Sequence, residues 1–365
     1  MNVGFNARLL ADPNTRGWNR YTVNLLAELP NFGVRPILYT DRPMHPDHLG
    51  RLHAGTYDVR IGCVQPYLLW EQVWLPLQCA RDDVDLLHAP ANFGLPRFGP
   101  CPCVLTLHDA IGAEKHGLRA RFFHSRARKN AHRIITVSEH SKQELIRVYR
   151  LEPGQVRVIP EAADASLVAH GASASLERLQ RLDPLKQPYF LYVGGWEERK
   201  NLPFLIDAFI DAGLADAHLV IAGRAPDSVV FPIIEYAVTS GDVDQFHFFS
   251  DGVTDAELAA LYSSALAFVY TSKHEGFGLQ LCEAMALGCP VLAARASSLP
   301  EVLGAGGETF ALENTSELVA LMRRVASDAD FREDLIRRAR VRSAHFSWKM
   351  TAERTVAVYR EVLQT

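Results

Sequence analysis

The stretch that decides the fold is residues 266–287, LAFVYTSKHEGFGLQLCEAMAL. It begins with an apolar run of strand length, Leu266 to Thr271, passes through a glycine-rich turn and continues as an amphipathic helix from Leu279 to Leu287. A strand that leads through such a turn into a helix is the repeating unit of parallel α/β sheets. The free amides at the start of the helix favour phosphate or sugar oxygens.

Apolar runs of strand length alternate with amphipathic segments along the rest of the chain. This alternation predicts a parallel sheet in each half. The strands expected in the first half are 3–6, 35–40, 57–64, 84–88, 104–108, 134–138 and 156–159. Those expected in the second half are 189–194, 218–223, 245–249, 266–271 and 290–294. We therefore expect two doubly wound domains that face each other across a crevice, with ligands bound at the carboxyl ends of the strands.

A chain of 365 residues is too long for one hydrophobic core. We expect an N-terminal domain over residues 1–170 and a polar linker over residues 171–187. A C-terminal domain over residues 188–346 should follow, and then a last helix over residues 347–365. The sequence alone leaves open whether that helix crosses back to the N-terminal domain.

The composition excludes several classes of protein. A hydrophobic fraction of 48% with 22% charged residues is that of a globular chain rather than a disordered, coiled-coil or collagen-like one. The sequence shows neither a signal peptide nor an apolar run of membrane-spanning length, so we expect a cytoplasmic protein. Six cysteines without a Cys-x-x-Cys pair do not suggest zinc or redox chemistry. The motifs of dehydrogenases, P-loop enzymes and serine hydrolases are absent.

One segment is strongly basic. Lys115 to Arg133 contains seven basic residues and no acidic one. It is either a solvated helix face or a surface for a phosphate-bearing acceptor or an anionic membrane, with peripheral contact at the inner membrane face. A formal net charge of -4 disfavours nucleic acid as a partner.

Two glutamates eight positions apart flank the glycine-rich turn. Glu275 precedes the helix, and Glu283 falls in its second turn. A carboxylate beside a diphosphate would be repelled, so each glutamate is expected to accept hydrogen bonds from neutral hydroxyls, one set from a hexose and the other from a ribose. Gly276 and Gly278 would let backbone amides approach the ligand closely.

Arg199 and Lys200 follow a second strand and turn, in YVGGWEERKN at residues 192–201. Two adjacent cations at the start of a helix oppose its macrodipole unless an anion is bound there. We therefore expect the pair to hold a diphosphate leaving group, as metal ions do in other architectures.

Two segments of the N-terminal half are weaker candidates. His108 ends an expected strand and could contact the reacting sugar, although a lone histidine is more often structural. Gly17 lies in a loop before the first helix, where its amide could reach a phosphate. Four neighbouring residues are expected on the acceptor side: Arg16, Trp18, Arg20 and Asp109.

Together these motifs resemble the retaining GT-B glycosyltransferases of family 4, over nearly the whole chain. The resemblance rests on the Glu-x7-Glu pair and on YVGGWEERKN, with ITVSEHSKQEL at 135–145, LVIAGR at 219–224, SLPEV at 298–302 and FSW at 346–348. It implies two Rossmann-like domains, transfer from a nucleotide sugar with retention at the anomeric carbon, and no metal or other cofactor.

The resemblance also assigns roles to single residues. It implies that Glu275 lies near the donor sugar, and that Glu283 binds the ribose. It implies a front-face substitution in which the departing phosphate oxygen accepts the acceptor's proton, so no enzymic nucleophile is needed. The remaining donor contacts that it implies come from Gly17, His108, Arg199, Lys200, Gly276, Phe277, Gly278 and Leu279.

The chain departs from the family pattern at Gln280, where many relatives have proline, and near Asp251, which could pair with guanine. The motifs look most like those of enzymes that build surface polysaccharides, many of which use GDP-mannose. We expect transfer of a hexose, mannose from GDP-mannose, to a lipid-linked or oligosaccharide acceptor. A UDP-hexose donor, a nucleotide-sugar 2-epimerase and a non-catalytic nucleotide-sugar binding protein stay open.

Overall fold

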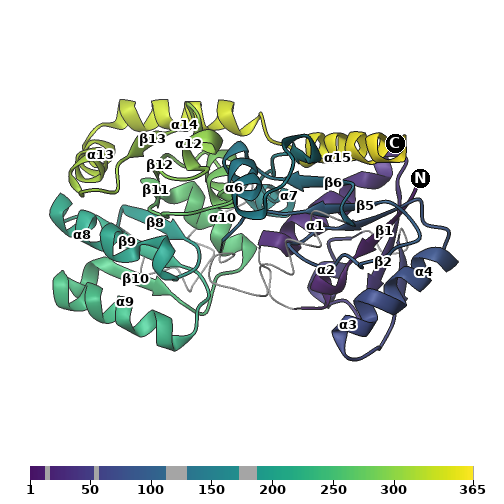
Figure 1. Ribbon diagram of the computed structural model, residues 1–365. Coiled ribbons are helices and arrows are strands. Elements are labelled where there is room, and N and C mark those ends of the chain that lie inside the picture. Colours follow the sequence, from purple (N-terminus) through teal and green to yellow (C-terminus); the bar gives the residue numbers. More distant parts are fainter. Residues whose placement is uncertain (13–16, 53–56, 112–129, 172–186, 365) are drawn as a thin grey trace. The chain divides into compact units, whose positions relative to one another are not determined.

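The computed structural model describes residues 1–12, 17–52, 57–111, 130–171 and 187–364. The chain divides into two compact units, Met1–Glu161 with Ser347–Thr365, and Ala162–Phe346. Each unit is built on its own parallel sheet with helices packed beside it, which confirms the expected fold class (Figure 1). Most of the predicted linker, residues 172–186, lies outside the described residues.

The sheet of the first unit has seven strands in the order β3-β2-β1-β4-β5-β6-β7. All neighbours pair in parallel. The order reverses between β1 and β4, which is the switch point of a doubly wound sheet. The strands are β1 (Asn2–Asn6), β2 (Arg35–Thr40), β3 (Asp58–Ile61), β4 (Leu86–Ala89), β5 (Cys103–Thr106), β6 (Arg133–Thr136) and β7 (Val156–Val158).

Helices α1, α4, α6 and α15 of the first unit contain buried residues, whereas α3 and η5 contain none. Ser138 caps α6 by accepting a hydrogen bond from the Ser141 amide at 3.0 Å, as its position before the helix predicts. The helical elements are η1 (Arg8–Ala11), α1 (Gly17–Glu28), η2 (Leu29–Phe32), α2 (Pro46–Leu49), α3 (Tyr67–Leu69), the π-helical η3 (Trp70–Trp74), α4 (Leu75–Arg81), α6 (Glu139–Tyr149), η5 (Pro153–Gln155) and α15 (Trp348–Leu363).

A buried chain of hydrogen bonds ties the last helix, α15, to the first unit's sheet. The Tyr359 hydroxyl lies 2.6 Å from His88 Nδ1, and His88 Nε2 lies 2.8 Å from Thr106 Oγ1. The Tyr21 hydroxyl of α1 joins Thr106 Oγ1 at 3.2 Å. Burial lowers the pKa of His88 to about 3, so the ring is neutral at pH 7. The chain thus connects α15, β4, β5 and α1 through uncharged groups.

Ion pairs also hold α15 near its C-terminal end. The Glu361 carboxylate lies 2.8 Å from the Arg133 guanidinium and 2.5 Å from the Arg157 guanidinium. Arg133 lies on β6 and Arg157 on β7, so α15 joins two strands that are 20 or more residues apart in sequence. The segment after residue 346 therefore completes the core of the first unit.

The sheet of the second unit has six parallel strands in the order β10-β9-β8-β11-β12-β13. The strands are β8 (Tyr189–Val193), β9 (His218–Ala222), β10 (Phe246–Phe249), β11 (Ala267–Tyr270), β12 (Val291–Ala294) and β13 (Glu308–Phe310). The helical elements are α7 (Ala165–Gly171), η8 (Glu198–Lys200), α8 (Leu202–Ala212), α9 (Asp227–Ser240), η9 (Val243–Gln245), α10 (Asp255–Ser264), α11 (Leu279–Ala286), α12 (Leu299–Leu303), α13 (Ser316–Ser327) and α14 (Ala329–Ser343).

The boundary between the units differs from the expected one at residue 170. Helix α7 belongs to the second unit, because it buries Leu167 and packs against α10. Ser166 also lies within 3.5 Å of Asp255 at the start of α10. The alanine- and serine-rich composition of residues 162–170 does not reveal this packing, since one buried leucine is enough to attach a two-turn helix.

We expect Tyr359→Phe to destabilise the first unit by about 1–3 kcal/mol, because buried His88 would lose a hydrogen-bond partner. Urea unfolding followed by tryptophan fluorescence measures this, since four of the five tryptophans lie in the first unit. Tyr236→Phe, at a partly exposed tyrosine of α9, is the control and should change stability by less than about 0.5 kcal/mol. Equal losses in the two variants would contradict a special role for the buried chain.

Candidate active site

The candidate site of the second unit is built on the loop between β11 and α11. Thr271 and Ser272 at its start are fully buried. Gly278 ends it with a φ of 91°, in the left-handed region where side chains are strained, and serves as the N-cap of α11. The strand-to-helix turn expected at residues 272–278 is therefore present.

A single carboxylate oxygen of this loop collects four hydrogen bonds. Glu275 Oε1 lies 2.6 Å from Lys200 Nζ and 3.0 Å from a guanidinium nitrogen of Arg199. It also accepts hydrogen bonds from the Ser272 hydroxyl at 2.6 Å and the Tyr270 hydroxyl at 3.0 Å. Lys200 Nζ in turn donates to the Tyr270 oxygen at 2.9 Å. We call these five residues the Glu275 cluster.

Burial and charge act against each other in the cluster. Burial alone would raise the pKa of Glu275, but the charges of Lys200 and Arg199 outweigh it and hold that pKa below its ordinary value. Burial also lowers the pKa of Lys200, and the nearby carboxylate offsets only part of this effect. With all three groups ionised, two cations face one anion. These three groups together carry one positive charge, and the charge of Glu197 also acts on Lys200.

The backbone holds the two cations beside the loop. Arg199 and Lys200 lie in η8, just after β8, which is the neighbour of β11 in the sheet. The Lys273 amide donates to the Arg199 carbonyl at 2.8 Å, and the Thr271 hydroxyl donates to the Lys200 carbonyl at 2.9 Å. The anion that the sequence predicts next to these two cations is therefore present inside the unit, because Glu275 is in contact with both of them.

Two serines after β12 fix the backbone of the loop. The Glu275 amide donates to Ser297 Oγ at 2.9 Å, and Ser298 Oγ lies 3.0 Å from the Glu275 carbonyl and 3.1 Å from the Phe277 carbonyl. These serines, together with Tyr270 and Ser272, are site residues that the sequence motifs did not indicate. All of them lie at or just after the carboxyl end of β11 or β12, so the rule that selected Glu275 could have found them.

The other donor residues expected in this unit lie around the same sheet. Glu283 is buried in α11, with the Tyr262 hydroxyl 3.5 Å from its carboxylate. Phe277 is also buried and packs edge-on against Phe346. Asp251 follows β10, and two strands, β9 and β8, separate β10 from β11. Gly276 and Leu279 complete the turn into α11.

His108 lies in a different setting, inside the first unit. Its Nδ1 lies 3.0 Å from Glu161 Oε1, and its Nε2 lies 3.0 Å from the Pro90 carbonyl. Trp18 stacks near the ring and Tyr21 meets it edge-on, with ring centroids 6.0 and 4.7 Å away. Both ring nitrogens thus face acceptors. That arrangement is satisfied when both nitrogens carry protons, and the Glu161 carboxylate then faces a charged ring.

The pKa of His108 follows from the same contacts. Burial by itself lowers it, but the hydrogen bond and charge of Glu161, with the Pro90 carbonyl, raise it above the ordinary value. The expected contact of His108 with a transferred sugar stays a prediction, since both nitrogens have partners inside the unit.

The other described residues expected in the N-terminal unit lie on α1 or next to His108 in sequence. Gly17 opens α1, and among the described residues outside its chain neighbours and its own helix backbone, no atom would lie within 4 Å of a β-carbon added there. The Asn24 side chain donates to the Arg20 carbonyl at 2.8 Å. Asp109 accepts a hydrogen bond from the Ile111 amide at 3.0 Å. Arg16 lies outside the described residues.

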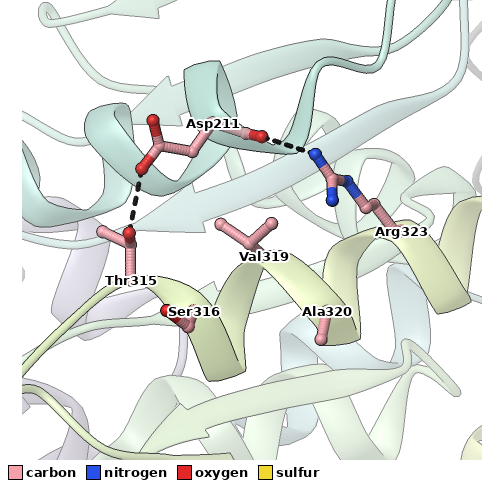
Figure 2. A pocket seen from close by; sticks show the side chains of 6 residues that line it. All are labelled: Asp211, Thr315, Ser316, Val319, Ala320 and Arg323. Carbon is pink, nitrogen blue, oxygen red and sulfur yellow. Dashed lines mark hydrogen bonds between the residues drawn. The ribbon is translucent and has the colours of Figure 1, made fainter.

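A shallow pocket in the second unit is lined by none of the residues of the Glu275 cluster. Figure 2 shows Asp211 at the end of α8 facing Thr315, Val319 and Arg323 of the α13 region. Arg323 donates to the carbonyls of Asp211 at 2.8 Å and Ala212 at 3.0 Å. These bonds satisfy the last carbonyls of α8, so the polar groups of this pocket are structural.

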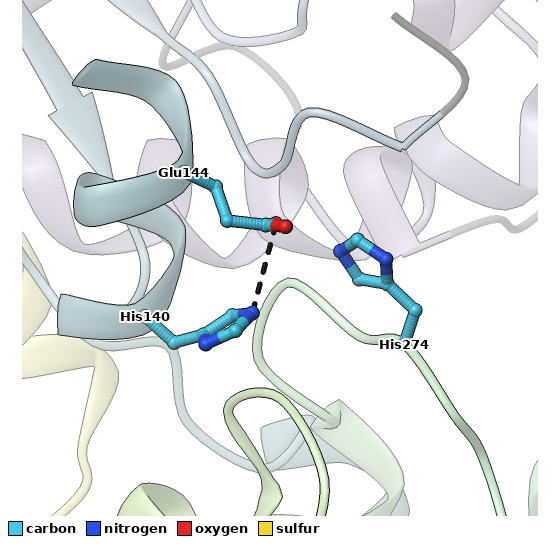
Figure 3. A group of neighbouring side chains, drawn as sticks. All are labelled: His140, Glu144 and His274. Atoms are coloured by element: carbon cyan, nitrogen blue, oxygen red, sulfur yellow. Dashed lines mark ion pairs between the residues drawn. The ribbon is translucent and has the colours of Figure 1, made fainter. Parts of the chain in front are cut away.

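Two titratable side chains on α6 form a local pair. His140 Nε2 lies 3.6 Å from Glu144 Oε2 one turn later, as Figure 3 shows. Such an i,i+4 pair supports a helix by a few tenths of a kcal/mol. The expectation that catalysis needs no metal stays a prediction.

Most of the basic segment from Lys115 to Arg133 lies outside the described residues, which resume at Asn130. Within the described part of the chain, no helix is long and apolar enough to cross a membrane.

Comparison with known families identifies the chain. The family described as Glycosyl transferases group 1 matches residues 175–342, and Glycosyltransferase Family 4 matches residues 15–167. Together the two matches take in most of both units. The chain belongs to the family 4 type of glycosyltransferases, as the sequence motifs predict.

Among curated relatives, O-antigen chain mannosyltransferase B of Escherichia coli is 28% identical over 292 residues, which cover 77% of this chain and 75% of the relative. Serotype-specific mannosyltransferase WbdA of E. coli is 30% identical over 243 residues, or 65% of this chain. This chain spans only 30% of the length of WbdA.

Solved structures share the fold over the whole chain. Anabaena Alr3699/HepE in complex with UDP and glucose gives a TM-score of 0.80 at 18% identity and covers 99% of this chain and 100% of its own. WaaG, a glycosyltransferase involved in lipopolysaccharide biosynthesis, gives 0.73 at 16% identity, with 98% and 99% covered. The fold is GT-B, and the chain is a glycosyltransferase.

We expect Glu275→Gln to destabilise the second unit by about 3 kcal/mol at pH 7, because Lys200 would keep a buried charge without its carboxylate. The pKa of Glu275 is lowered in the folded state, so this stabilisation is present above about pH 4.5 and is lost as the pH falls through the folded pKa. Amide hydrogen exchange in α11 measures it. Glu198→Gln, at an exposed acid of η8, is the control. A pH-independent loss would contradict the assignment to an ion pair.

We expect Glu161→Gln to bring the pKa of His108 from above its ordinary value of about 6.5 to below it, because burial would then dominate. The raised folded pKa means that the pair stabilises the first unit fully below about pH 6.5 and loses its effect as the pH rises through that pKa. A 15N NMR titration of the imidazole nitrogens measures both states. The His88 ring is the internal control and should stay neutral from about pH 5 upward. An unchanged His108 titration would refute the pairing.

Proposed function

We propose that this glycosyltransferase transfers mannose from GDP-mannose, with retention at the anomeric carbon, to a lipid-linked or oligosaccharide acceptor in the synthesis of a surface polysaccharide. The observation that carries a nucleotide-sugar donor is the Glu275 cluster. It places two cations and a carboxylate at the carboxyl end of the central strand β11, with one positive charge in excess. Mannose is favoured because the relatives described above are named as mannosyltransferases.

The cluster suggests how a donor would be held. Lys200 makes two hydrogen bonds among the described residues, to Tyr270 and Glu275, and an ammonium group carries three protons. Its third proton would go to a diphosphate oxygen. The carboxylate holds both cations in place before the donor arrives, so little reorganisation is needed on binding. We propose that Arg199 and Lys200 supply the positive charge for the leaving group, without a metal.

Other roles in the proposal follow the family resemblance. Glu275 would also accept hydrogen bonds from donor-sugar hydroxyls, and the amides of residues 276–279 would contact the same sugar. Glu283 would bind the ribose, and Asp251 the guanine. The departing phosphate oxygen would take the acceptor's proton. In the first unit, His108 and Gly17 would lie on the donor's side and Arg16, Trp18, Arg20 and Asp109 on the acceptor's.

A UDP-hexose donor is the second candidate. It is supported by the fold shared with HepE, whose solved structure contains UDP and glucose. The base contact decides between the two nucleotides, because guanine offers an N1-H and a 2-amino group to a carboxylate and uracil does not offer that pair.

We expect calorimetric titration to give micromolar binding of GDP and at least tenfold weaker binding of UDP. Lys200→Ala and Glu283→Ala should each weaken GDP by about 10- to 100-fold, because each removes a hydrogen bond to or from a charged group. Glu198→Gln is the matched surface control and should bind as the wild type does. Asp251→Asn should weaken GDP and leave UDP unchanged. Tighter binding of UDP than of GDP would refute the proposed base and donor.

Product analysis separates the reaction classes. NMR of the product with a mannose-terminated acceptor should show the anomeric configuration of the donor. An epimerised nucleotide sugar formed without acceptor would indicate a 2-epimerase instead. Tight donor binding with neither hydrolysis nor transfer would indicate a binding protein.

A further inference from the structure

Three of the six cysteines gather in the core of the first unit. Cys79 lies on α4 and Cys103 begins β5, and both are buried in one apolar cluster. Cys101, just before β5, packs against the same cluster. All six cysteines of the chain carry free thiols. The spacing of the cysteines in the sequence gives no sign of this group, because the whole of β4 lies between Cys79 and Cys101 in the chain.

The backbone brings Cys79 and Cys101 to the same end of β4. The Val84 amide, just before β4, donates to the Cys79 carbonyl at 3.1 Å. The Leu87 amide of β4 donates to the carbonyl of Pro102, the residue after Cys101, at 2.9 Å. Two segments that are attached to one end of a strand lie close together, and here the two thiols form a hydrogen bond with each other.

The two thiols differ in their access to solvent and in their acidity. Cys79 is 1% exposed, whereas Cys101 is partly exposed and follows an exposed segment, residues 97–100. The Cys79 thiol donates to the Cys101 sulfur, and this hydrogen bond lowers the pKa of Cys101 although burial and the charge of Asp85 act in the opposite direction. The same hydrogen bond, together with burial, raises the pKa of Cys79. Cys101 therefore has the access and the thiolate character of a nucleophile, and Cys79 waits behind it.

Cys103 is a poorer partner for Cys101. Its thiol donates to the Cys101 carbonyl at 3.6 Å and is therefore directed at the backbone. Burial also raises the pKa of Cys103 to about 12, so its thiol stays protonated at neutral pH. A protonated thiol is a weak nucleophile, which leaves Cys79 as the cysteine that can react with an oxidised Cys101.

We propose that Cys79 and Cys101 form a reversible disulfide that stabilises the first unit when the chain meets a low-molecular-weight disulfide such as oxidised glutathione. The Cys101 thiolate attacks one sulfur of oxidised glutathione, whose S–S bond breaks and releases one glutathione thiolate. The Cys79 sulfur then attacks Cys101 in the mixed disulfide and expels the second glutathione. The two cysteines lose two electrons, the two glutathione sulfurs gain them, and the protons of both cysteines end on the released thiols.

The bond joins the end of α4 to the segment before β5. A cross-link of this kind reduces the conformational freedom of the unfolded chain, so the oxidised first unit resists unfolding. The Glu275 cluster lies in the second unit, and the proposal therefore does not depend on which nucleotide sugar is the donor.

Peptide mapping by mass spectrometry tests the proposal on the full folded chain. Cys63→Ser serves as the background, because Cys63 is exposed and would take up glutathione by itself. After incubation with oxidised glutathione, most molecules should contain a Cys79–Cys101 cross-link that dithiothreitol removes. In the same background, Cys79→Ala should stop at the mixed disulfide and keep glutathione on Cys101. Cys101→Ala should leave Cys79 unmodified, since Cys79 is buried.

Cys103→Ala is the matched control and should form the cross-link to the same extent as the background. Urea unfolding followed by tryptophan fluorescence should give the oxidised background a midpoint about 1 M higher than the reduced one. The affinity for GDP or UDP, whichever binds, should be the same in both forms, which separates this disulfide from the donor site.

Three outcomes would overturn the proposal. One is a folded chain that forms no cross-link, or forms it only in urea. Another is a cross-link to Cys103 in place of Cys79. The third is a midpoint that does not rise on oxidation, because the bond would then give the first unit no stability.

Discussion

The interaction on which the second unit's site depends is the buried contact between Lys200 and Glu275. A carboxylate that is 8% exposed and an ammonium that is 4% exposed could not stay ionised there separately. Their contact fixes the positions of η8 and of the loop after β11 relative to each other. Ser272, Tyr270 and Arg199 then complete the hydrogen bonding of the same oxygen. Much of the geometry of this loop follows from the need to satisfy one buried anion.

The first unit also contains buried ionisable side chains, and they are stabilised by a histidine–glutamate contact. His108 and Glu161 form a buried pair, and aromatic rings surround the imidazole. A histidine pair weakens as the pH rises and a glutamate pair weakens as it falls, so the two units have opposite sensitivities. Nearby His88 shows the alternative outcome. It has only a hydroxyl on each side, and burial therefore leaves it neutral.

Much of the architecture could be predicted from the sequence, because buried parallel strands are short apolar runs between amphipathic segments. The edge strand β13 was missed, since Glu308–Phe310 has three residues and only Phe310 is fully buried. The predicted domain boundary at residue 170 lies after the observed one at residue 161, because the short alanine-containing helix α7 gives almost no periodic signal. In the site, the glycine-rich turn revealed Glu275. Tyr270 ends β11 itself, and Ser297 and Ser298 follow β12, so their positions at strand ends could have indicated them. A single sequence does not show which of these side chains contact the loop.

The cluster also explains why the residue types suggested a different arrangement. Sequence reasoning separated the glutamate from the cations, since a carboxylate and a diphosphate repel each other. In the folded unit the Glu275 carboxylate lies between Arg199 and Lys200 and holds both cations in place. The three groups still carry one positive charge, so the glutamate and the cations need not be separated. A diphosphate bound there, as we propose, would meet cations whose positions are already fixed and would not have to order long, flexible side chains. In the proposed reaction, the carboxylate would lower the attraction for the leaving group but would also lower the entropic cost of binding it.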